Sequence, residues 1–375
     1  MIGLYIHIPF CAQKCAYCDF LSFPGNHHAE KKRYLAALSR ELKLRVQGRW
    51  RTPQTIFIGG GTPTSLDAEA LAQLLAAIGE VVDLAGVEEF TVEANPGSVD
   101  AEKLAALRDG GVNRLSFGVQ SFDDGLLRRI GRVHTAAEAM EAVQLARAAG
   151  FTNINLDLMY GLPGQSEQQW RTTIAQALAL SPKHLSLYQL IPEEGTAIVR
   201  QMAAGTLPPV DEDGAAQWFD RQRRWLAAHG YAQYEISNYA RPGYASQHNQ
   251  LYWRLDDYLG LGLGATSWQR PLRQTNTADF GAYCLALEAG KLPPHDEERL
   301  SRQEQQSESV FMALRMNAGL SRARFRVLYG EDVTQVFAGA IREGVQRGWL
   351  ALNDEALKLT DEGRRLGNWV FELFL

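Results

Sequence analysis

Three of the four cysteines lie within the segment HIPFCAQKCAYCDF, with the spacing C-x3-C-x2-C. Cys11, Cys15 and Cys18 are thiol ligands of the kind that hold zinc or an iron–sulfur cluster. A structural zinc site is the main alternative, but such a site usually closes with a fourth Cys or His at a characteristic spacing. Here Asp19 and Phe20 follow the third cysteine. Three thiolates on a four-iron cluster leave one iron open to a small molecule, so we favour the cluster.

Two other residues are candidates for a fourth ligand. Cys284 is far away in the sequence, in the amphipathic stretch TADFGAYCLALEAG, and is expected to be a lone thiol in the core. His7 lies inside a predicted strand, where a structural role is the more common one. We therefore expect neither residue to complete the set.

Composition is that of an ordinary globular protein. The chain has 375 residues, of which 46% are hydrophobic and 22% charged, which fits two or three domains. A net charge of -5 gives no electrostatic reason to expect a nucleic-acid partner. No apolar run reaches the roughly 18 residues of a membrane span, and the opening MIGLYIHIPF does not resemble a signal peptide. Few, clustered cysteines suit a reducing compartment. These features predict a cytoplasmic protein that is not integral to a membrane.

Strands and helices are expected to alternate along the first half of the chain. Strict alternation predicts a parallel sheet, because parallel neighbours need crossover connections. The predicted fold class is α/β, with an incomplete parallel (β/α)6 barrel as the domain 1–195. The six strand segments are IGLYIHI, QTIFIGGGTP, EEFTVEANPG, VNRLSFGVQ, TNINLDLMYGLPGQ and HLSLYQLIP.

Polar and glycine-rich residues follow these strands directly. In barrel-like α/β folds, binding sites gather at the carboxyl ends of the strands. Five strand ends are therefore expected to converge on one site. They carry Cys11–Cys18, Gly59–Thr62, Glu93–Asn95, Gln120 and Asp157.

The second half divides into a connecting, substrate-facing segment, 196–298, and a C-terminal module, 299–375. The module should hold three helices and a hairpin, which is typical of winged-helix-like modules. Many such modules bind DNA, but residues 297–375 contain 11 Lys and Arg against 12 Asp and Glu. Phosphate contacts need a basic surface. We therefore expect the module to pack against the barrel or cover a substrate.

Taken together, the motifs resemble those of the radical S-adenosylmethionine (radical SAM) proteins. YIHIPFC, GGGTPT, EANPG, SFGVQSF, LDLMYGLPGQ and HNQLYW are similar to segments of one subgroup. That subgroup contains the oxygen-independent coproporphyrinogen III oxidases and the HemW-type heme chaperones. The resemblance runs from Leu4 to about Trp268 and is weaker beyond. It implies a radical SAM barrel with a [4Fe-4S] cluster on the three clustered cysteines and SAM on the open iron.

The resemblance also assigns residues to SAM, and each has a simpler reading. The glycines would let backbone approach the cofactor, although a tight turn would also explain them. A Glu at a strand end is often solvated or salt-bridged, RRIGR fits an exposed helix end, and the tyrosines could be packing residues. The assigned residues, some of which contact a second SAM in the relatives, are Tyr5, Tyr17, Gly60, Gly61, Thr62, Glu93, Gln120, Arg132 and Asp157.

Two departures favour the chaperones within this subgroup. Phe20 stands where the oxidases carry another cysteine, and the first strand begins almost at Met1, without the oxidases' N-terminal extension. HNQLYW resembles the H-N-x-x-Y-W motif of the chaperones. Imidazole is a good axial ligand for heme iron, so His248 is a candidate heme contact, with a structural histidine as the alternative. Tyr252 and Trp253 would offer flat apolar contact to a porphyrin.

The resemblance therefore implies a radical SAM protein that binds heme as cargo and delivers it to apo-hemoproteins, without coproporphyrinogen oxidase activity. No catalytic residue is assigned. The alternatives are oxidative decarboxylation of coproporphyrinogen III to protoporphyrinogen IX, and a radical SAM enzyme with an unrelated substrate. Cleavage of SAM stays open, and so does a homodimer linked through the exposed irons. Thr266 replaces a histidine that relatives commonly carry in their GxGAHS segment.

Overall fold

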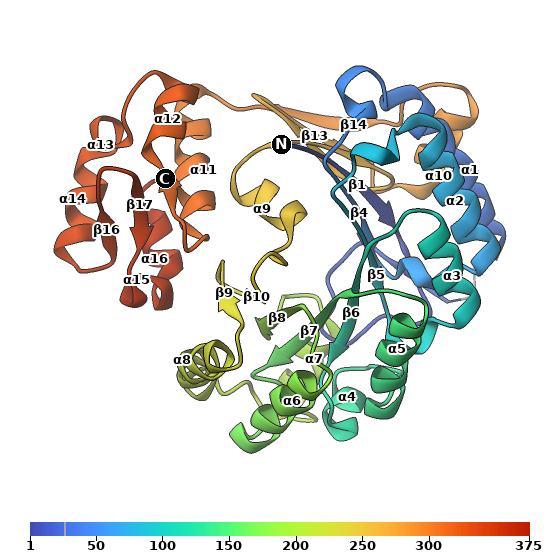
Figure 1. Ribbon diagram of the computed structural model, residues 1–375, viewed down its shortest axis with the longest axis horizontal. Helices are drawn as coiled ribbons and strands as arrows, with labels where there is room; N and C mark the ends of the chain where they lie inside the picture. Colours follow the sequence, from blue (N-terminus) through green and yellow to red (C-terminus); the bar gives the residue numbers. More distant parts are fainter. Residues whose placement is uncertain (26–27) are drawn as a thin grey trace.

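Six parallel strands form the centre of the molecule in the computed structural model, which describes residues 1–25 and 28–375. They neighbour one another in sequence order. Figure 1 shows them curving around one side of the molecule without closing, which confirms the predicted incomplete barrel. The strands are β1 (Ile2–Ile8), β4 (Thr55–Gly60), β5 (Glu89–Ala94), β6 (Arg114–Gln120), β7 (Asn153–Tyr160) and β8 (His184–Gln189).

Helices between these strands cover the outer face of the sheet (Figure 1). Asp67, Asp100 and Asp123 cap the amino ends of three of them, and Thr135 and Ser166 form capping boxes on two others. Each such cap stabilises a helix by about 1 kcal/mol and fixes where it begins. The helices are α1 (His28–Arg45), α2 (Ala68–Val81), α3 (Ala101–Asp109), α4 (Asp124–Arg129), α5 (Ala136–Ala148) and α6 (Glu167–Ala179), with 3-10 turns η1 (Gly48–Arg51), η2 (Pro63–Ser65), η3 (Leu84–Gly86) and η4 (Pro96–Ser98).

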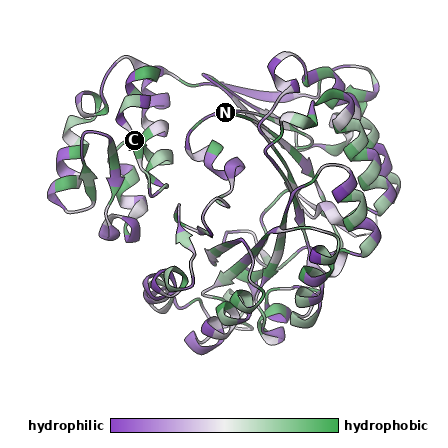
Figure 2. Ribbon diagram, viewed as in Figure 1, coloured by the Kyte–Doolittle hydropathy of each residue, from purple (hydrophilic) through white to green (hydrophobic). Residues whose placement is uncertain are grey.

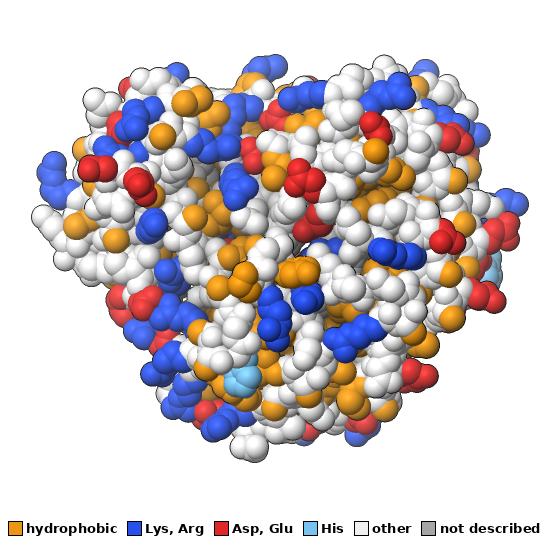
Figure 3. Space-filling model, in the orientation of Figure 1, with side chains coloured by type: hydrophobic (Ala, Val, Ile, Leu, Met, Phe, Trp, Pro, Cys, Tyr) orange, Lys and Arg blue, Asp and Glu red, His pale blue; other side chains and the backbone are white. Residues whose placement is uncertain are grey.

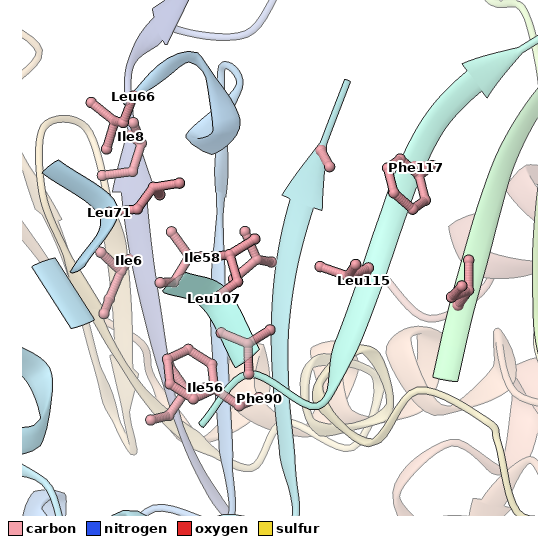
Figure 4. Packing of buried hydrophobic residues seen from close by; sticks show 14 of the residues in the cluster. Ile6, Ile8, Ile56, Ile58, Leu66, Leu71, Phe90, Leu107, Leu115 and Phe117 are labelled. Carbon is pink, nitrogen blue, oxygen red and sulfur yellow. The ribbon is translucent and has the colours of Figure 1, made fainter. Parts of the chain in front are cut away.

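Successive residues of the parallel strands face two chemically different environments. The residues that face the helices are aliphatic or aromatic and almost wholly buried. Each such side chain contributes about 1.5–3 kcal/mol by burial, so this layer holds the helices to the sheet. Figure 4 shows part of it, with Ile6, Ile8, Ile56, Ile58, Phe90, Leu115 and Phe117 of the strands against Leu66, Leu71 and Leu107.

The alternate residues are mostly polar, although many of them are buried as well. Because side chains of a strand alternate in direction, these residues line the inside of the barrel. In-register pairing places them side by side on neighbouring strands. They include Tyr5, His7, Thr55, Glu89, Thr91, Glu93, Arg114, Ser116, Asn155, Asp157, His184 and Ser186.

Both edges of the parallel sheet are extended by strands that the sequence analysis did not predict. β11 (Asp257–Leu261) pairs parallel with β1, and three antiparallel strands continue that edge. On the other edge, a short antiparallel strand pairs with β8. The complete sheet has 12 strands. The additional strands are β12 (Thr266–Gln269), β13 (Leu272–Asn276), β14 (His295–Arg299), β10 (Asn238–Ala240) and β9 (Ala232–Gln233).

A buried carboxylate ties the extension to the barrel. Glu41 of α1 is fully buried and accepts hydrogen bonds from Gly262 N at 2.8 Å, Asn276 Nδ2 at 2.8 Å and Tyr283 Oη at 2.6 Å. Arg45 supplies the opposite charge at 3.2 Å. Because a buried carboxylate without partners is costly, this set of bonds fixes the loop after β11 against α1.

Shorter elements complete the barrel half. β2 (Phe10–Cys11) and β3 (Phe23–Pro24) pair with each other and enclose the cysteine segment. Cys284 lies fully buried and unpaired in its helix, which confirms the predicted core thiol. The helices of this half are α7 (Ala197–Ala203), α8 (Glu212–Ala228), α9 (Gln247–Trp253) and α10 (Phe280–Glu288).

The C-terminal module has its own hydrophobic core and a three-stranded antiparallel sheet in the order β15-β17-β16. The predicted hairpin is present. The module has more helices than the three predicted, because the helical segments around Phe337 and Leu366 are each divided in two. The elements are α11 (Arg302–Leu314), β15 (Leu320–Ser321), α12 (Arg322–Tyr329), α13 (Val333–Val336), α14 (Ala338–Gln346), β16 (Leu350–Leu352), β17 (Ala356–Leu359), α15 (Asp361–Arg365) and α16 (Gly367–Glu372).

The module lies across the open side of the barrel (Figure 1). Ion pairs join it to the barrel half: Arg223 of α8 to Asp361 at 2.6 Å, and Arg324 of α12 to Asp256 at 2.6 Å. Figure 2 shows hydrophobic positions concentrated where helices meet the sheet, with polar positions on the outward helix faces. The predicted domain boundaries at 195 and 298 stay a prediction. Within the described residues, no helix is both long and apolar enough to cross a membrane.

Candidate functional site

The cysteine segment lies at the carboxyl end of β1. Cys11 is buried, Cys15 and Cys18 are half-buried, and none of the three forms a disulfide. A turn joins the last two through a hydrogen bond from Cys18 N to Cys15 O at 3.2 Å, and Ala16 N donates to Ile130 O at 2.9 Å. The segment is therefore held by β2–β3 pairing on one side and by the end of α4 on the other.

The donor set matches an iron–sulfur cluster better than a zinc site. Three unpaired thiols share the loop, and thiolates are the ligands that such clusters use. Across residues 1–25 and 28–375, no three Cys, His, Asp or Glu side chains stand close enough together to hold a single metal ion. A [4Fe-4S] cluster does not need such convergence, because each of its cysteine ligands binds a different iron. Burial raises the pKa of the Cys11 and Cys18 thiols.

The glycine run after β4 lies directly against this segment. Gly61 N donates to Ile8 O at 2.9 Å and Thr62 N to Phe10 O at 2.8 Å. Gly60 has φ +115°, and a Cβ there would lie 2.5 Å from the His7 ring. A Cβ on Gly61 would lie 2.9 Å from Cys11 Sγ. A side chain at either position would clash with β1 or with the cysteine segment that follows it. Glycine is therefore needed for the end of β4 to pack this closely against them.

Glu93, near the carboxyl end of β5, contacts the backbone of the glycine run after β4. Its carboxylate accepts a hydrogen bond from Gly60 N at 3.1 Å. Loss of water inside the barrel and the nearby charge of Asp157 raise the pKa of Glu93 to about 8. This carboxyl therefore holds its proton more strongly than an ordinary Glu.

Asp157 belongs to β7 and faces the inside of the barrel, where its carboxylate is hydrogen-bonded by neighbouring side chains. Ser116 Oγ donates to it at 2.8 Å and Asn155 Nδ2 at 3.0 Å. Burial also raises the pKa of Asp157. Two carboxyl groups of raised pKa thus lie inside the barrel near the cysteine segment.

Gln120 and Arg132 come from the end of β6 and the turn after α4. Gln120 adopts φ +65°, next to a register irregularity in the strand. Such a backbone costs a non-glycine residue about 1–3 kcal/mol and is common at functional sites. Arg132 Nη1 lies 3.3 Å from Cys15 Sγ, and Nη2 donates to Gly118 O. The simpler reading of Arg132 as an exposed helix end is wrong.

The two tyrosines lie on different sides of the cysteine segment. Tyr5 Oη is 2.9 Å from His7 Nδ1, inside the barrel. Tyr17 packs with Leu126 and Ile130 of the helix layer. Burial raises the pKa of both phenols above the ordinary value. Tyr5 therefore faces the cavity, whereas Tyr17 supports the loop from outside.

Two cavities flank the cysteine segment. One, of about 370 Å3, is lined by Tyr5, Gly60, Glu93, Phe20 and Thr266 among others. The second, of about 320 Å3, includes Cys15, Thr62 and Arg132 in its lining. Volumes near 300 Å3 lie at the lower limit of the range found for small-molecule sites. Five of the nine residues assigned to SAM thus line one of these two cavities, and the other four do not. The four are Tyr17, Gly61, Gln120 and Asp157.

The second cavity also contains residues that the sequence analysis missed. Lys103 Nζ donates to Thr64 O at 3.0 Å and Ser98 O at 2.8 Å, and Lys31 Nζ donates to Ser65 O at 2.8 Å. The proximity of Lys103, after burial, lowers the pKa of Lys31. These lysines lie in helices with no motif around them, so no sequence signal indicated them.

The polar inner face was also missed, although a signal existed. RLSFG and NINLD place a polar residue at every second position of a parallel strand. Period two in a buried strand means that one face meets helices and the other a polar interior. The pattern therefore indicated a polar lumen.

His248 lies at the opposite end of the barrel from the cysteines. It is fully buried, with Nδ1 2.8 Å from Thr55 Oγ1 and Nε2 2.8 Å from Tyr252 Oη. Its ring stacks on Phe57 at 5.2 Å. Burial lowers the pKa of His248 to about 3, so the ring is neutral. Both nitrogens are occupied, and an iron could reach one only after a hydrogen bond is broken.

Comparison with known proteins supports the resemblance. A model of the radical SAM superfamily matches residues 5–177, and one of the HemN C-terminal domain matches residues 300–366. A heme chaperone HemW of Bacillus subtilis (strain 168) is 39% identical over 378 residues, covering 100% of this chain and 99% of the relative. HemW of Escherichia coli (strain K12) is 37% identical over 384 residues, covering 100% and 98%.

A solved structure also matches this chain over its whole length. Coproporphyrinogen III oxidase (HemN) from Escherichia coli, a radical SAM enzyme, has a TM-score of 0.86 at 24% identity, covering 100% of this chain and 89% of that one. At this identity the likeness establishes the fold. The fold is thus shared with an oxidase, whereas sequence similarity over the full length is to chaperones.

Proposed function

The chain belongs to the HemW family of heme chaperones within the radical SAM superfamily, and from this we propose that it binds heme and delivers it to apo-hemoproteins. The observation that carries the proposal is similarity to the chaperones over the full length of the chain. Phe20, which is 64% exposed beside the cysteine segment, agrees with it. The resemblance places a cysteine of the oxidases at that position.

Membership of the superfamily implies a [4Fe-4S] cluster and SAM. We propose that Cys11, Cys15 and Cys18 hold the cluster, which in this superfamily supplies one electron to the sulfonium of bound SAM. Arg132, close to Cys15, would offset the negative charge of thiolates, and Thr62 Oγ1 stands 3.5 Å from Cys11 Sγ. Both contacts would stabilise the charged sulfurs.

The remaining assigned residues have separate roles in this proposal. Gly60 and Gly61 keep the strand end close to the cysteines, so that backbone N–H and C=O groups can reach the methionine part of SAM. Glu93 and Asp157 offer carboxylate acceptors for its amino and ribose hydroxyl groups. Tyr5 lines the cavity around it, whereas Tyr17 supports the cysteine segment from outside. Gln120 shapes the end of β6 through its backbone, with φ +65°.

Heme at His248 would have to bind at the amino end of the barrel. His248 stays a predicted contact, but the seven-residue helix that carries it seals the amino end of the barrel. Gly3, at the level of His248, and Ile8 are five residues apart on β1, which is about 17 Å at 3.3 Å per residue. Heme on His248 would therefore lie far from the cysteine segment. The cytoplasm as location and a homodimer remain predictions.

The test is transfer of heme. Anaerobically reconstituted protein loaded with heme is mixed with an apo-hemoprotein, such as apomyoglobin, and the absorption spectrum of the recipient is followed. Saturable binding near one heme per chain and a recipient spectrum that grows with time are expected. The same preparation is given coproporphyrinogen III, SAM and a reductant. Formation of protoporphyrinogen without heme transfer would favour the oxidase alternative.

A further inference from the structure

A groove on the outside of the barrel, between α6 and α8, is not part of the site described above. It encloses about 410 Å3 and is floored by aromatic and aliphatic side chains. Trp170, Ile174 and Trp218 are buried in its floor, and Trp225 forms a half-buried wall. Trp170 and Trp218 are only 2% and 6% exposed, so Trp225 supplies most of the aromatic surface that a ligand could contact.

Basic side chains stand around this apolar floor. Arg171, Arg221 and Arg224 line the groove together with a single acidic residue, Glu167. Arg221 is paired with Glu167 at 2.6 Å. Among the described residues, neither Arg171 nor Arg224 has an acidic side chain within ion-pair distance. Figure 3 shows Lys and Arg side chains gathered over the part of the surface where α8 lies. The groove therefore suits a flat apolar ligand that carries carboxylates.

A histidine at the end of α8 contacts Trp225, which forms one wall of the groove. His229 is exposed, and its ring packs edge-on against Trp225 with the centroids 5.9 Å apart. Nδ1 lies 2.8 Å from the carbonyl oxygen of Trp225, which can only accept a hydrogen bond. In the neutral ring the proton is thus held on Nδ1, and the lone pair on Nε2 is not used in this hydrogen bond. This is the arrangement in which histidine binds metals.

Other histidines of the described chain are less suitable. The rings of His7 and His248 have both nitrogens hydrogen-bonded, and so has His184. His134 is buried. His295 contacts Pro293 O and Glu297. His28 is exposed at the first residue of α1, and it provides a matched control.

We propose that this groove is a heme site, with His229 Nε2 as an axial ligand of the iron. The porphyrin would lie against Trp218 and Trp225, and its propionates would reach Arg171 and Arg224. The inference rests on the proposed function and names where the cargo binds. A shallow outer site leaves one porphyrin edge in solvent, which allows a recipient protein to approach.

The first experiment is a titration of the full-length protein with ferric heme, followed by visible absorption and electron paramagnetic resonance. His229→Ala should weaken binding by at least about tenfold and should change the spin-state signal, because the axial nitrogen is lost. His28→Ala should bind as the wild type does. Arg171→Glu with Arg224→Glu should weaken binding while leaving the spin-state signal of the bound heme unchanged.

The outcomes separate the site from the function. If His229→Ala binds heme with unchanged affinity and spectrum, the site is wrong while the chaperone function stands. The same holds if His248→Ala alone abolishes the axial signal. If wild-type protein does not bind heme at all, both the proposed function and this site are overturned. Normal heme affinity in every groove variant, with transfer alone lost, would mean that the groove docks the recipient, and would also overturn the site.

Discussion

The two ends of the barrel are built from the same strands but are completed in opposite ways. At the amino end, α9 closes the barrel, and Glu89 accepts hydrogen bonds from Ser246 Oγ, Gln247 N and His248 N at 2.9 to 3.1 Å. At the carboxyl end, three thiols stay unpaired and two cavities adjoin the loop. At the amino end the buried polar groups are hydrogen-bonded to one another within the protein. At the carboxyl end the free thiols and the residues that line the cavities are available to a bound ligand.

This difference explains how one polar interior can serve two purposes. Buried polar groups cost free energy unless they are hydrogen-bonded. His248 meets that condition with two side-chain partners, so it contributes to stability. Asp157 accepts hydrogen bonds from Ser116 and Asn155, whereas Glu93 accepts one from Gly60 N, and burial raises the pKa of each carboxyl. Substitutions at the two ends should therefore fail differently: loss of ligand at the carboxyl end and loss of stability at the amino end.

The largest effect is expected from removing the thiols. A variant with Cys11→Ala, Cys15→Ala and Cys18→Ala should bind almost none of the roughly four irons per chain expected after anaerobic reconstitution. Its urea midpoint without iron should fall only slightly, since Cys11 alone of the three is buried and each substitution removes a single sulfur atom. Iron analysis and visible absorption provide the measurement, with Cys284→Ala as control. Full iron loading in the triple variant would refute the cluster assignment.

At the sealed end, His248→Ala should lower the free energy of unfolding by about 3 kcal/mol, because Thr55 and Tyr252 lose their partner and a cavity forms. Urea denaturation followed by circular dichroism measures this loss. The control is His28→Ala, an exposed substitution expected to change stability by less than about 0.5 kcal/mol. Equal stability of the two variants would break the contrast between the ends.

At the open end, Gly60→Ala should lower the free energy of unfolding by about 2 kcal/mol, since its φ of +115° and the His7 ring leave no room for Cβ. SAM affinity should fall by more than tenfold by equilibrium dialysis of the reconstituted protein. The matched control is Gly86→Ala, where a Cβ would meet nothing within 4 Å. Unchanged SAM affinity in Gly60→Ala would remove the glycine run from the proposed site.

The smallest effect concerns pH. Because the pKa of Glu93 is about 8 in the folded protein against an ordinary 4.5, the folded state holds one more proton between those values. The free energy of unfolding should therefore fall as pH rises from about 4.5 to 8, and Glu93→Gln should flatten this decline. Exposed Glu102→Gln should leave the slope as it is. A steeper decline in Glu93→Gln would contradict the raised pKa.

Much of the barrel could be predicted because local signals and fold agree there. Apolar strand segments alternated with helices, and β5 (Glu89–Ala94) lies within the expected strand segment EEFTVEANPG. The extension could not be predicted in the same way. β11 and β12 are short strands in a glycine- and aromatic-rich stretch, and they exist because β1 offers an edge for pairing.

The sequence by itself determined the thiol set, the glycine run and the order of strands and helices, because these depend on residue type and short spacing. Only the tertiary structure decided that Arg132 stands beside Cys15, that His248 is sealed among its partners, and that His229 is exposed beside a tryptophan groove. Such relations join residues far apart in the chain. Burial and hydrogen bonding, which set what a side chain can bind, are fixed only when distant segments pack together.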